Sequence, residues 1–210
     1  MIDTKRNFDK DAALWDENPG RVKMVQRIFD TITSEINLTS SMDVLDFGCG
    51  TGLLTMRMAP LVRSITGIDT SQGMLDVLNA KISDGHLAHV KTRFVDLEKG
   101  GALKGRYHLI TSSMTFHHIK NIGQVLDQFY KVLLPEGKIC IADLDSDDGE
   151  FHENNEGVFH FGFEREHLSL LIQKAGFKDI KCLTAARITK PVSGRAARVF
   201  TIFLITGRKL

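Results

Sequence analysis

The sequence contains few of the residues that stabilise small secreted or metal-binding proteins. Its 210 residues include three cysteines, Cys49, Cys140 and Cys182, whose wide separation matches neither a zinc site nor a disulfide framework. Its 27 basic and 26 acidic residues nearly cancel, so the chain as a whole does not attract nucleic acid or an anionic membrane. The N-terminus is polar, and no apolar run approaches the length of a membrane span. We therefore expect a cytoplasmic protein with no metal site and no nucleic-acid or membrane partner.

The length and composition are those of a globular protein. Apolar residues make up 42% of the chain and charged residues 25%, which is ordinary for a folded domain. A chain of 210 residues buries enough apolar surface to fold without a disulfide or a metal. We predict a single domain over residues 1–210, as a monomer or homodimer. Residues 1–36 are expected to form a leader and helix that acts as a lid, and residues 40–206 the core.

The most informative stretch runs from Val44 to Gly52. A predicted apolar strand leads into three glycines at alternate positions, and a predicted helix with apolar first residues begins at Leu53. Glycine has no Cβ, so the backbone can turn sharply there and come close to a ligand. The pattern predicts a nucleotide-binding corner. In a dinucleotide-binding fingerprint the third glycine would stand where Leu53 stands, and no Gly-Lys-Ser/Thr follows, so a P-loop is excluded.

Two acidic residues end the next two predicted strands. Asp69 ends the strand predicted over residues 64–69 and lies 17 residues after Gly52, while Asp96 follows the strand predicted over residues 90–95. An acid at such a strand end can accept hydrogen bonds from both hydroxyls of a ribose. Two acids at successive strand ends suit a nucleoside without phosphate, one for the ribose and one near the adenine amino group.

Strands and helices alternate through most of the chain. A strand at residues 107–112, a helix at 123–133 and a strand at 138–144 follow the nucleotide corner, and two apolar runs at 180–184 and 199–205 close the sheet. Alternation of this kind requires parallel crossovers and places ligands at the carboxyl ends of the strands. The sequence therefore predicts a doubly wound α/β fold.

Five successive motifs resemble those of class I S-adenosylmethionine-dependent methyltransferases, most closely the branch that acts on small molecules. They are residues 44–52, 67–71, 94–97, 116–119 and 133–138. The resemblance implies a Rossmann-like α/β fold with a mostly parallel seven-stranded sheet, an antiparallel last strand and helices on both faces. It also implies S-adenosylmethionine as cofactor, with S-adenosylhomocysteine as product.

The resemblance assigns roles to residues of these motifs. Gly48 and Gly50 would offer backbone groups to the methionine part of the cofactor, and Asp46 would orient its amino group. Asp69 would bind the ribose hydroxyls. Asp96 would accept from the adenine amino group beside the Leu97 amide. Further cofactor-site candidates are Gly52, Thr70, Ser112 and Met74, the last of which either rests on the adenine face or packs in the core.

The stretch from Ser112 to Ile119 stands where the methyl acceptor should enter. His117 is the first candidate for a base that removes a proton from the acceptor, and His118 is the second. Either histidine alternatively serves only to hydrogen-bond the backbone. Motifs of the enzymes that methylate DNA or protein glutamine, and a basic appended domain, are missing. A small-molecule acceptor is therefore expected.

Several alternatives remain open at this stage. The motifs report cofactor binding and not turnover, so a non-catalytic S-adenosylmethionine-binding or regulatory protein is an alternative, and a nicotinamide-dependent oxidoreductase is a weaker one. Trp15 either anchors the leader or belongs to a lid. The acidic stretch at residues 143–152 is either a solvated loop or a surface that attracts a cationic acceptor. The basic residues Arg187, Lys190, Arg195 and Arg198 favour a solvated surface over a phosphate site.

Overall fold

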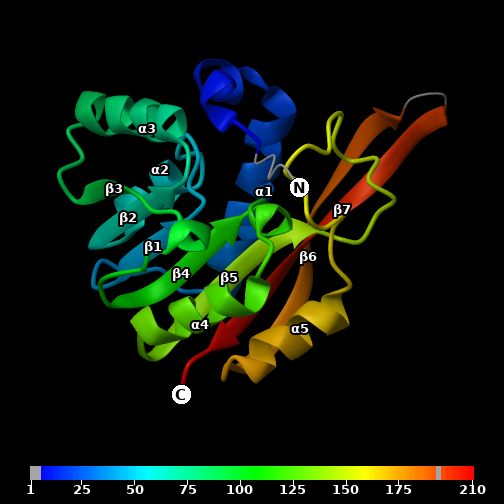
Figure 1. Ribbon diagram of the computed structural model, residues 1–210. Coiled ribbons are helices and arrows are strands. Elements are labelled where there is room, and N and C mark those ends of the chain that lie inside the picture. The colour runs from blue at the N-terminus through cyan, green and yellow to red at the C-terminus, as the bar shows by residue number, and fades with distance from the viewer. Residues whose placement is uncertain (1–5, 193–194) are drawn as a thin grey trace.

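A single seven-stranded sheet forms the centre of the molecule. The computed structural model describes residues 6–192 and 195–210. In space the strands follow the order β3-β2-β1-β4-β5-β7-β6 (Figure 1). Strands β1 to β5 pair in parallel, and β7 runs antiparallel to both β5 and β6. The strands are β1 (Asp43–Phe47), β2 (Ser64–Asp69), β3 (Val90–Phe94), β4 (Tyr107–Ser113), β5 (Leu133–Leu144), β6 (Lys178–Val192) and β7 (Arg195–Arg208).

Helices cover both faces of this sheet, because successive strand residues point to opposite sides. Val44 belongs to an apolar cluster with Ile28 and Ile32 of α1, whereas its neighbour Leu45 packs with residues of α4 and α5, such as Phe129. The predicted doubly wound sheet with an antiparallel last strand is confirmed. The helices are α1 (Pro19–Glu35), α2 (Thr55–Met58), α3 (Gln72–Asp84), α4 (Ile122–Val132) and α5 (Arg165–Lys174).

Short polar residues fix where the helices begin. The Asn18 side chain accepts a hydrogen bond from the backbone N–H of Arg21, and Pro19 occupies the first position of α1, where its missing N–H is not needed. The predicted turn at Asn18-Pro19-Gly20 is thus the start of this helix. Ser71 caps α3 as predicted, by accepting from the Met74 N–H at 3.2 Å.

The last two strands are much longer than their apolar runs. Lys178–Val192 and Arg195–Arg208 form a hairpin that extends beyond the rest of the sheet (Figure 1). Its outer part carries charged residues such as Arg187 and Arg198, so hydrophobicity alone does not mark it as strand. The extension brings the outer part of β6 to the carboxyl edge of the parallel strands.

The strand order reverses between β1 and β4, the position at which doubly wound sheets bind ligands. The glycine loop follows β1, Asp69 ends β2, and the stretch with His117 and His118 follows β4. All of these segments therefore meet at one edge of the sheet. Among the described residues, no helix is long and apolar enough to cross a bilayer.

Candidate functional site

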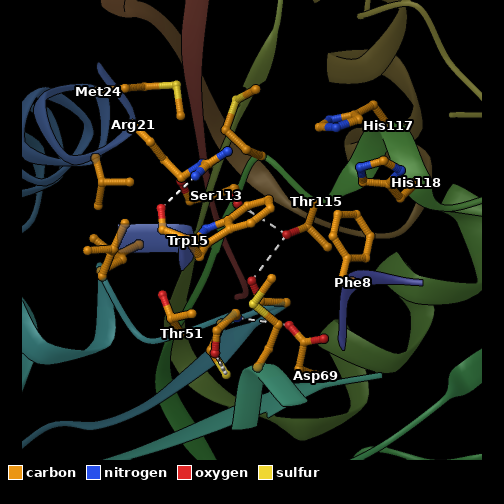
Figure 2. A pocket seen from close by; sticks show the side chains of 18 of the residues that line it. Phe8, Trp15, Arg21, Met24, Thr51, Asp69, Ser113, Thr115, His117 and His118 are labelled. Atoms are coloured by element: carbon orange, nitrogen blue, oxygen red, sulfur yellow. Dashed lines mark hydrogen bonds between the residues drawn. The ribbon is translucent and has the colours of Figure 1, made fainter. Parts of the chain in front are cut away.

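A cavity of about 400 Å³ opens at this edge, within the size range of small-molecule sites. Its floor is the glycine loop and the ends of β1, β2 and β4, and its roof is the N-terminal segment (Figure 2). Eight residues predicted from the sequence line it. They are Asp46, Gly48, Gly50, Asp69, Thr70, Met74, His117 and His118.

The glycine loop is shaped for close approach of a ligand. Gly48 and Gly50 both have left-handed backbones, with φ of 69° and 54°, which side chains rarely adopt. A Cβ on Gly48 would lie 2.3 Å from the Thr115 side chain, whereas one on Gly50 would meet no atom within 4 Å. The backbone at Gly50 thus faces the open cavity. These two positions form a cradle that a side chain would fill, which fits the nucleoside cofactor implied by the motifs.

Asp69 holds this loop together as well as facing the cavity. Its carboxylate accepts from the Gly50 N–H at 2.8 Å and from the Ser71 N–H at 2.9 Å. It therefore joins the loop after β1 to the cap of α3. The carboxylate also lines the cavity, and each of its oxygens can accept more than one hydrogen bond.

Asp46 is buried beneath the glycine loop. Burial raises the pKa of its carboxyl to about 6, although hydrogen bonds from the Thr55 hydroxyl at 2.5 Å and the Thr111 hydroxyl at 3.0 Å favour the ionised form. An ammonium group placed beside it would favour the ionised form further. Asp46 is thus suited to the amino group of the cofactor's methionine part.

His117 is paired with a buried acid that the sequence analysis did not select. Its Nδ1 lies 2.7 Å from Oδ1 of Asp143, and its backbone N–H donates to the other oxygen at 3.3 Å. Burial alone would raise the pKa of Asp143, but the charge and hydrogen bonds of His117 lower it. The pair fixes the imidazole with Nδ1 protonated, and Nε2 makes no hydrogen bond to any described residue.

Two further histidines surround this pair. The ring centroid of His117 lies 4.1 Å from that of His118 and 4.9 Å from that of His152. Burial lowers the pKa of His118 to about 3 and that of His152 to about 4, so both rings are neutral near pH 7. His118 Nδ1 donates to the Gly157 carbonyl at 2.7 Å. Among the described residues, no group of three or more His, Cys, Asp or Glu side chains is arranged to hold a metal ion.

The N-terminal segment covers the cavity. Phe8 in the short helix Phe8–Lys10 packs against His118 with ring centroids 5.1 Å apart, and Trp15 in Ala12–Glu17 lies over the middle of the pocket (Figure 2). Two aspartates fasten the segment. Asp9 accepts from the Ser71 hydroxyl at 2.5 Å and the Gly73 N–H at 2.9 Å, and Asp16 accepts from the Thr51 hydroxyl at 2.6 Å.

Four residues predicted for the cofactor site do not line the cavity. Gly52 lies against α3, where a Cβ would fall 2.3 Å from Leu78. Asp96 caps the short helix Leu97–Lys99 by accepting from the Glu98 N–H at 3.1 Å, and Leu97 is buried in the core. Ser112 is buried, and its hydroxyl has no hydrogen-bond partner among the described residues. Their predicted roles in cofactor binding stay predictions.

The acidic stretch after β5 is largely paired within the protein. Asp145 forms a two-pronged hydrogen bond with Arg165 at 2.6 Å, and Arg198 lies 2.6 Å from Glu150 and 3.2 Å from Asp148. Because these acids are already paired with arginines, the contacts favour a loop with a structural role over a surface that attracts a cationic acceptor. Lys190, expected on a solvated surface, instead lines the cavity.

Comparison with known proteins agrees with this geometry. The family model described as "Methyltransferase domain" matches residues 21–181. The chain belongs to this methyltransferase family. It is 30% identical over 179 residues to an uncharacterized methyltransferase of Schizosaccharomyces pombe, covering 74% of this chain and 63% of that protein. It is 26% identical over 198 residues to a malonyl-[acyl-carrier protein] O-methyltransferase of Acetivibrio thermocellus, covering 90% of this chain and 65% of that one.

The chain thus spans less than two thirds of the length of these two methyltransferase relatives. Among solved structures, an S-adenosylmethionine-dependent methyltransferase from Aquifex aeolicus superimposes with a TM-score of 0.71 at 16% identity, covering 96% of this chain and 98% of that one. The YcgJ protein from Bacillus subtilis gives a TM-score of 0.72 at 13% identity, covering 88% of this chain and 98% of that one. These likenesses establish the shared methyltransferase fold.

Proposed function

We propose that this protein transfers a methyl group from S-adenosylmethionine to a hydroxyl group of a small molecule. The observation that carries the proposal is a single cavity lined by the glycine loop, by Asp69 and by His117, whose ring is held from behind by the buried Asp143. Two relatives support oxygen as the acceptor atom. They are named malonyl-[acyl-carrier protein] O-methyltransferase and ubiquinone biosynthesis O-methyltransferase.

The residues of the cavity floor would hold the cofactor. Gly48 and Gly50 would offer backbone groups to the methionine part of the cofactor. The carboxylate of Asp46 would bind the cofactor's amino group, and the carboxylate of Asp69 would bind its ribose. When bound, S-adenosylmethionine supplies a methyl group already activated on a sulfonium centre. The protein therefore needs mainly to orient the acceptor and exclude water, rather than to create an electrophile.

His117 would remove the proton of the acceptor hydroxyl. With Nδ1 held by Asp143, Nε2 of His117 is the ring atom left to accept a proton from a ligand in the cavity. Asp143 keeps the ring in this tautomer and stabilises the imidazolium that forms, as a buried carboxylate does for histidine in hydrolases. Phe8 and Trp15 cover the cavity and exclude water from this proton transfer.

The first experiment is calorimetric titration of the purified chain with S-adenosylmethionine, S-adenosylhomocysteine and NAD. We expect binding of the first two and none of NAD. The second is transfer of labelled methyl from S-adenosylmethionine to a panel of phenols, alcohols and amines. Cofactor binding without transfer to any of them would favour the non-catalytic alternative, and binding of NAD alone would overturn the proposal.

A further inference from the structure

Three cations from distant parts of the sequence line one region of the cavity. Arg6 belongs to the N-terminal segment, Arg21 to α1 and Lys190 to β6. The three lie close enough to affect one another. Burial and then the charge of Arg6 lower the pKa of Arg21, while Asp11 and Asp16 raise it. Burial lowers the pKa of Lys190, Glu153 raises it, and the charge of Arg21 lowers it further. Their arrangement thus brings like charges together in a partly buried place.

Acidic side chains lie near these cations, but among the described residues only Asp11 forms an ion pair with one of them. Arg6 pairs with Asp11 at 2.8 Å. Arg21 donates to the main-chain carbonyl of Trp15 at 2.5 Å, and Lys190 donates to that of Phe151. Within residues 6–192 and 195–210, neither Arg21 nor Lys190 forms an ion pair. Partly buried cations without a direct ion-pair partner are costly, so an anionic ligand in contact with them would be stabilised.

The surroundings of these cations are aromatic. The guanidinium of Arg21 lies 3.6 Å above the Trp15 ring centroid, which holds it in a fixed orientation (Figure 2). Lys190 lies 4.4 Å from the centroid of Phe151. The neighbouring His152 lines the same cavity, and its buried Nε2 has no hydrogen-bond partner among the described residues. A flat ring bearing both a hydroxyl and an anionic group would match this combination.

Two of these cations, Lys190 and Arg6, lie near the histidines. The pKa of His152 is lowered first by burial, then by the charge of His117, with smaller contributions from Lys190 and Arg6. In Figure 2 Arg21 and Asp69 lie on opposite sides of Trp15, so Arg21 is placed away from the expected ribose site. Lys190 contacts Phe151, the neighbour of His152, and the His152 ring lies 4.9 Å from that of His117. An anion bound to Lys190 would therefore lie near the site of the proposed proton transfer.

We propose that Arg21 and Lys190 bind a carboxylate of the methyl acceptor, and that the acceptor is an aromatic hydroxy acid. His152 offers Nε2 as a further hydrogen-bonding position for this ligand. The inference rests on the proposed function, because it assigns the substrate class of the same site. The other source of a carboxylate is the methionine part of the cofactor itself, and the experiment must separate the two.

The test uses Arg21→Gln, Lys190→Gln and the double variant, with Lys23→Gln on the exposed side of α1 as control. The protein saturated with S-adenosylhomocysteine is titrated calorimetrically with the three hydroxybenzoate isomers and with the matching uncharged hydroxybenzamides. We expect at least one hydroxybenzoate to bind about tenfold or more tightly than its amide, the range of a hydrogen bond to a charged group, and the double variant to lose this preference. Lys23→Gln should retain it.

A second titration identifies the source of the carboxylate. Each variant is titrated with S-adenosylhomocysteine and with 5′-methylthioadenosine, which lacks the methionine carboxylate. The proposal predicts unchanged affinity for both. A loss of affinity for S-adenosylhomocysteine alone would assign the cations to the cofactor and overturn the proposal, as would equal binding of acids and amides to the wild type. If S-adenosylhomocysteine does not bind the wild type at all, the proposed function itself fails.

Discussion

At the scale of single residues, the ionisation of Asp46 should control how cofactor binding responds to pH. Burial raises its pKa to about 6, and a neighbouring ammonium group would lower it again. Binding therefore releases a proton below pH 6, and affinity rises with pH up to about 6 and then levels. We expect S-adenosylhomocysteine to bind about tenfold more weakly at pH 5 than at pH 7, measured by calorimetry.

Asp46→Asn is the control for this pH dependence, because the amide cannot ionise but retains an oxygen for the Thr55 or Thr111 hydroxyl. Its affinity should be lower near neutral pH and nearly flat between pH 5 and 7. If the variant followed the wild-type profile, the titrating group would lie elsewhere.

The His117–Asp143 pair is expected to govern turnover and not cofactor affinity. His117→Gln should lower kcat about a hundredfold or more, the usual contribution of a general base, while calorimetric affinity for S-adenosylhomocysteine changes less than about twofold. Asp143→Asn should lower kcat as well, because Nδ1 of His117 loses its ionised partner. Both are measured by labelled methyl transfer to an acceptor found in the panel.

His118→Gln serves as comparison, since its Nδ1 is engaged by the Gly157 carbonyl and the low pKa of its ring makes it a weak base. It should retain more activity than His117→Gln. Full activity of His117→Gln would mean that methyl transfer proceeds without a protein base. A loss confined to His118→Gln would reverse the two assignments made from the sequence.

Asp143 shows why part of the site was not predictable from the sequence. The glycines and the two strand-end acids stand at recognisable spacings, so the corner could be located without a structure. Asp143 belongs to an acidic stretch with no such spacing, and its role depends on the pairing of β4 with β5, which places it beside a histidine 26 residues earlier in the chain.

At the scale of elements, the N-terminal segment is expected to act as a lid held by two aspartates. Asp9 contacts the first turn of α3, and Asp16 contacts the glycine loop through the Thr51 hydroxyl and forms an ion pair with Lys81. The double variant Asp9→Asn/Asp16→Asn weakens these contacts without removing side-chain volume. We expect S-adenosylhomocysteine to dissociate about tenfold faster, since two charge-assisted contacts are weakened.

Stopped-flow displacement gives this dissociation rate, and limited proteolysis reports opening of the segment. The matched control is Asp30→Asn, which alters an exposed contact with Gln26 within α1. The lid interpretation would be wrong if the double variant released the ligand at the wild-type rate while the segment became sensitive to protease.

The long β6–β7 hairpin is the element that sequence reasoning described least well. Its inner part carries the apolar runs that predict two strands, whereas its outer part is charged and gives no strand signal. Register with β7 extends β6 as far as Val192, and this extension carries Lys190 to the cavity. Pairing between strands supplied the structure that residue preferences did not indicate.

At the scale of the whole molecule, the alternation of apolar segments predicts the doubly wound α/β class, and the family resemblance adds the seven strands and the antiparallel last strand. Alternate residues such as Val44 and Leu45 divide between two apolar clusters on opposite faces of the sheet, and the order of strands and helices required parallel crossovers. The cavity was less predictable, since its walls come from the N-terminal segment, α1 and β6 as well as the predicted edge. Contacts between such distant segments leave no periodic trace in the sequence.

Because the cavity joins these distant segments, cofactor binding should stabilise the whole fold. A ligand that binds only the folded state adds about 2.7 kcal/mol to the free energy of unfolding at a hundred times its Kd. For a protein of this size that corresponds to a rise in Tm of about 5–10 °C, at about 2–4 °C per kcal/mol. Differential scanning fluorimetry with S-adenosylhomocysteine measures this rise.

Asp69→Asn tests whether the rise in Tm caused by the ligand depends on the predicted ribose contact of Asp69. The amide keeps one oxygen for the Gly50 or Ser71 N–H but loses the charge, so the folded loop should be less perturbed than in Asp69→Ala. At the same ligand concentration we expect the rise in Tm to fall to less than half. If the variant alone melts as the wild type does and the ligand still raises its Tm fully, Asp69 does not bind the ribose, and its carboxylate serves only to join the glycine loop to α3.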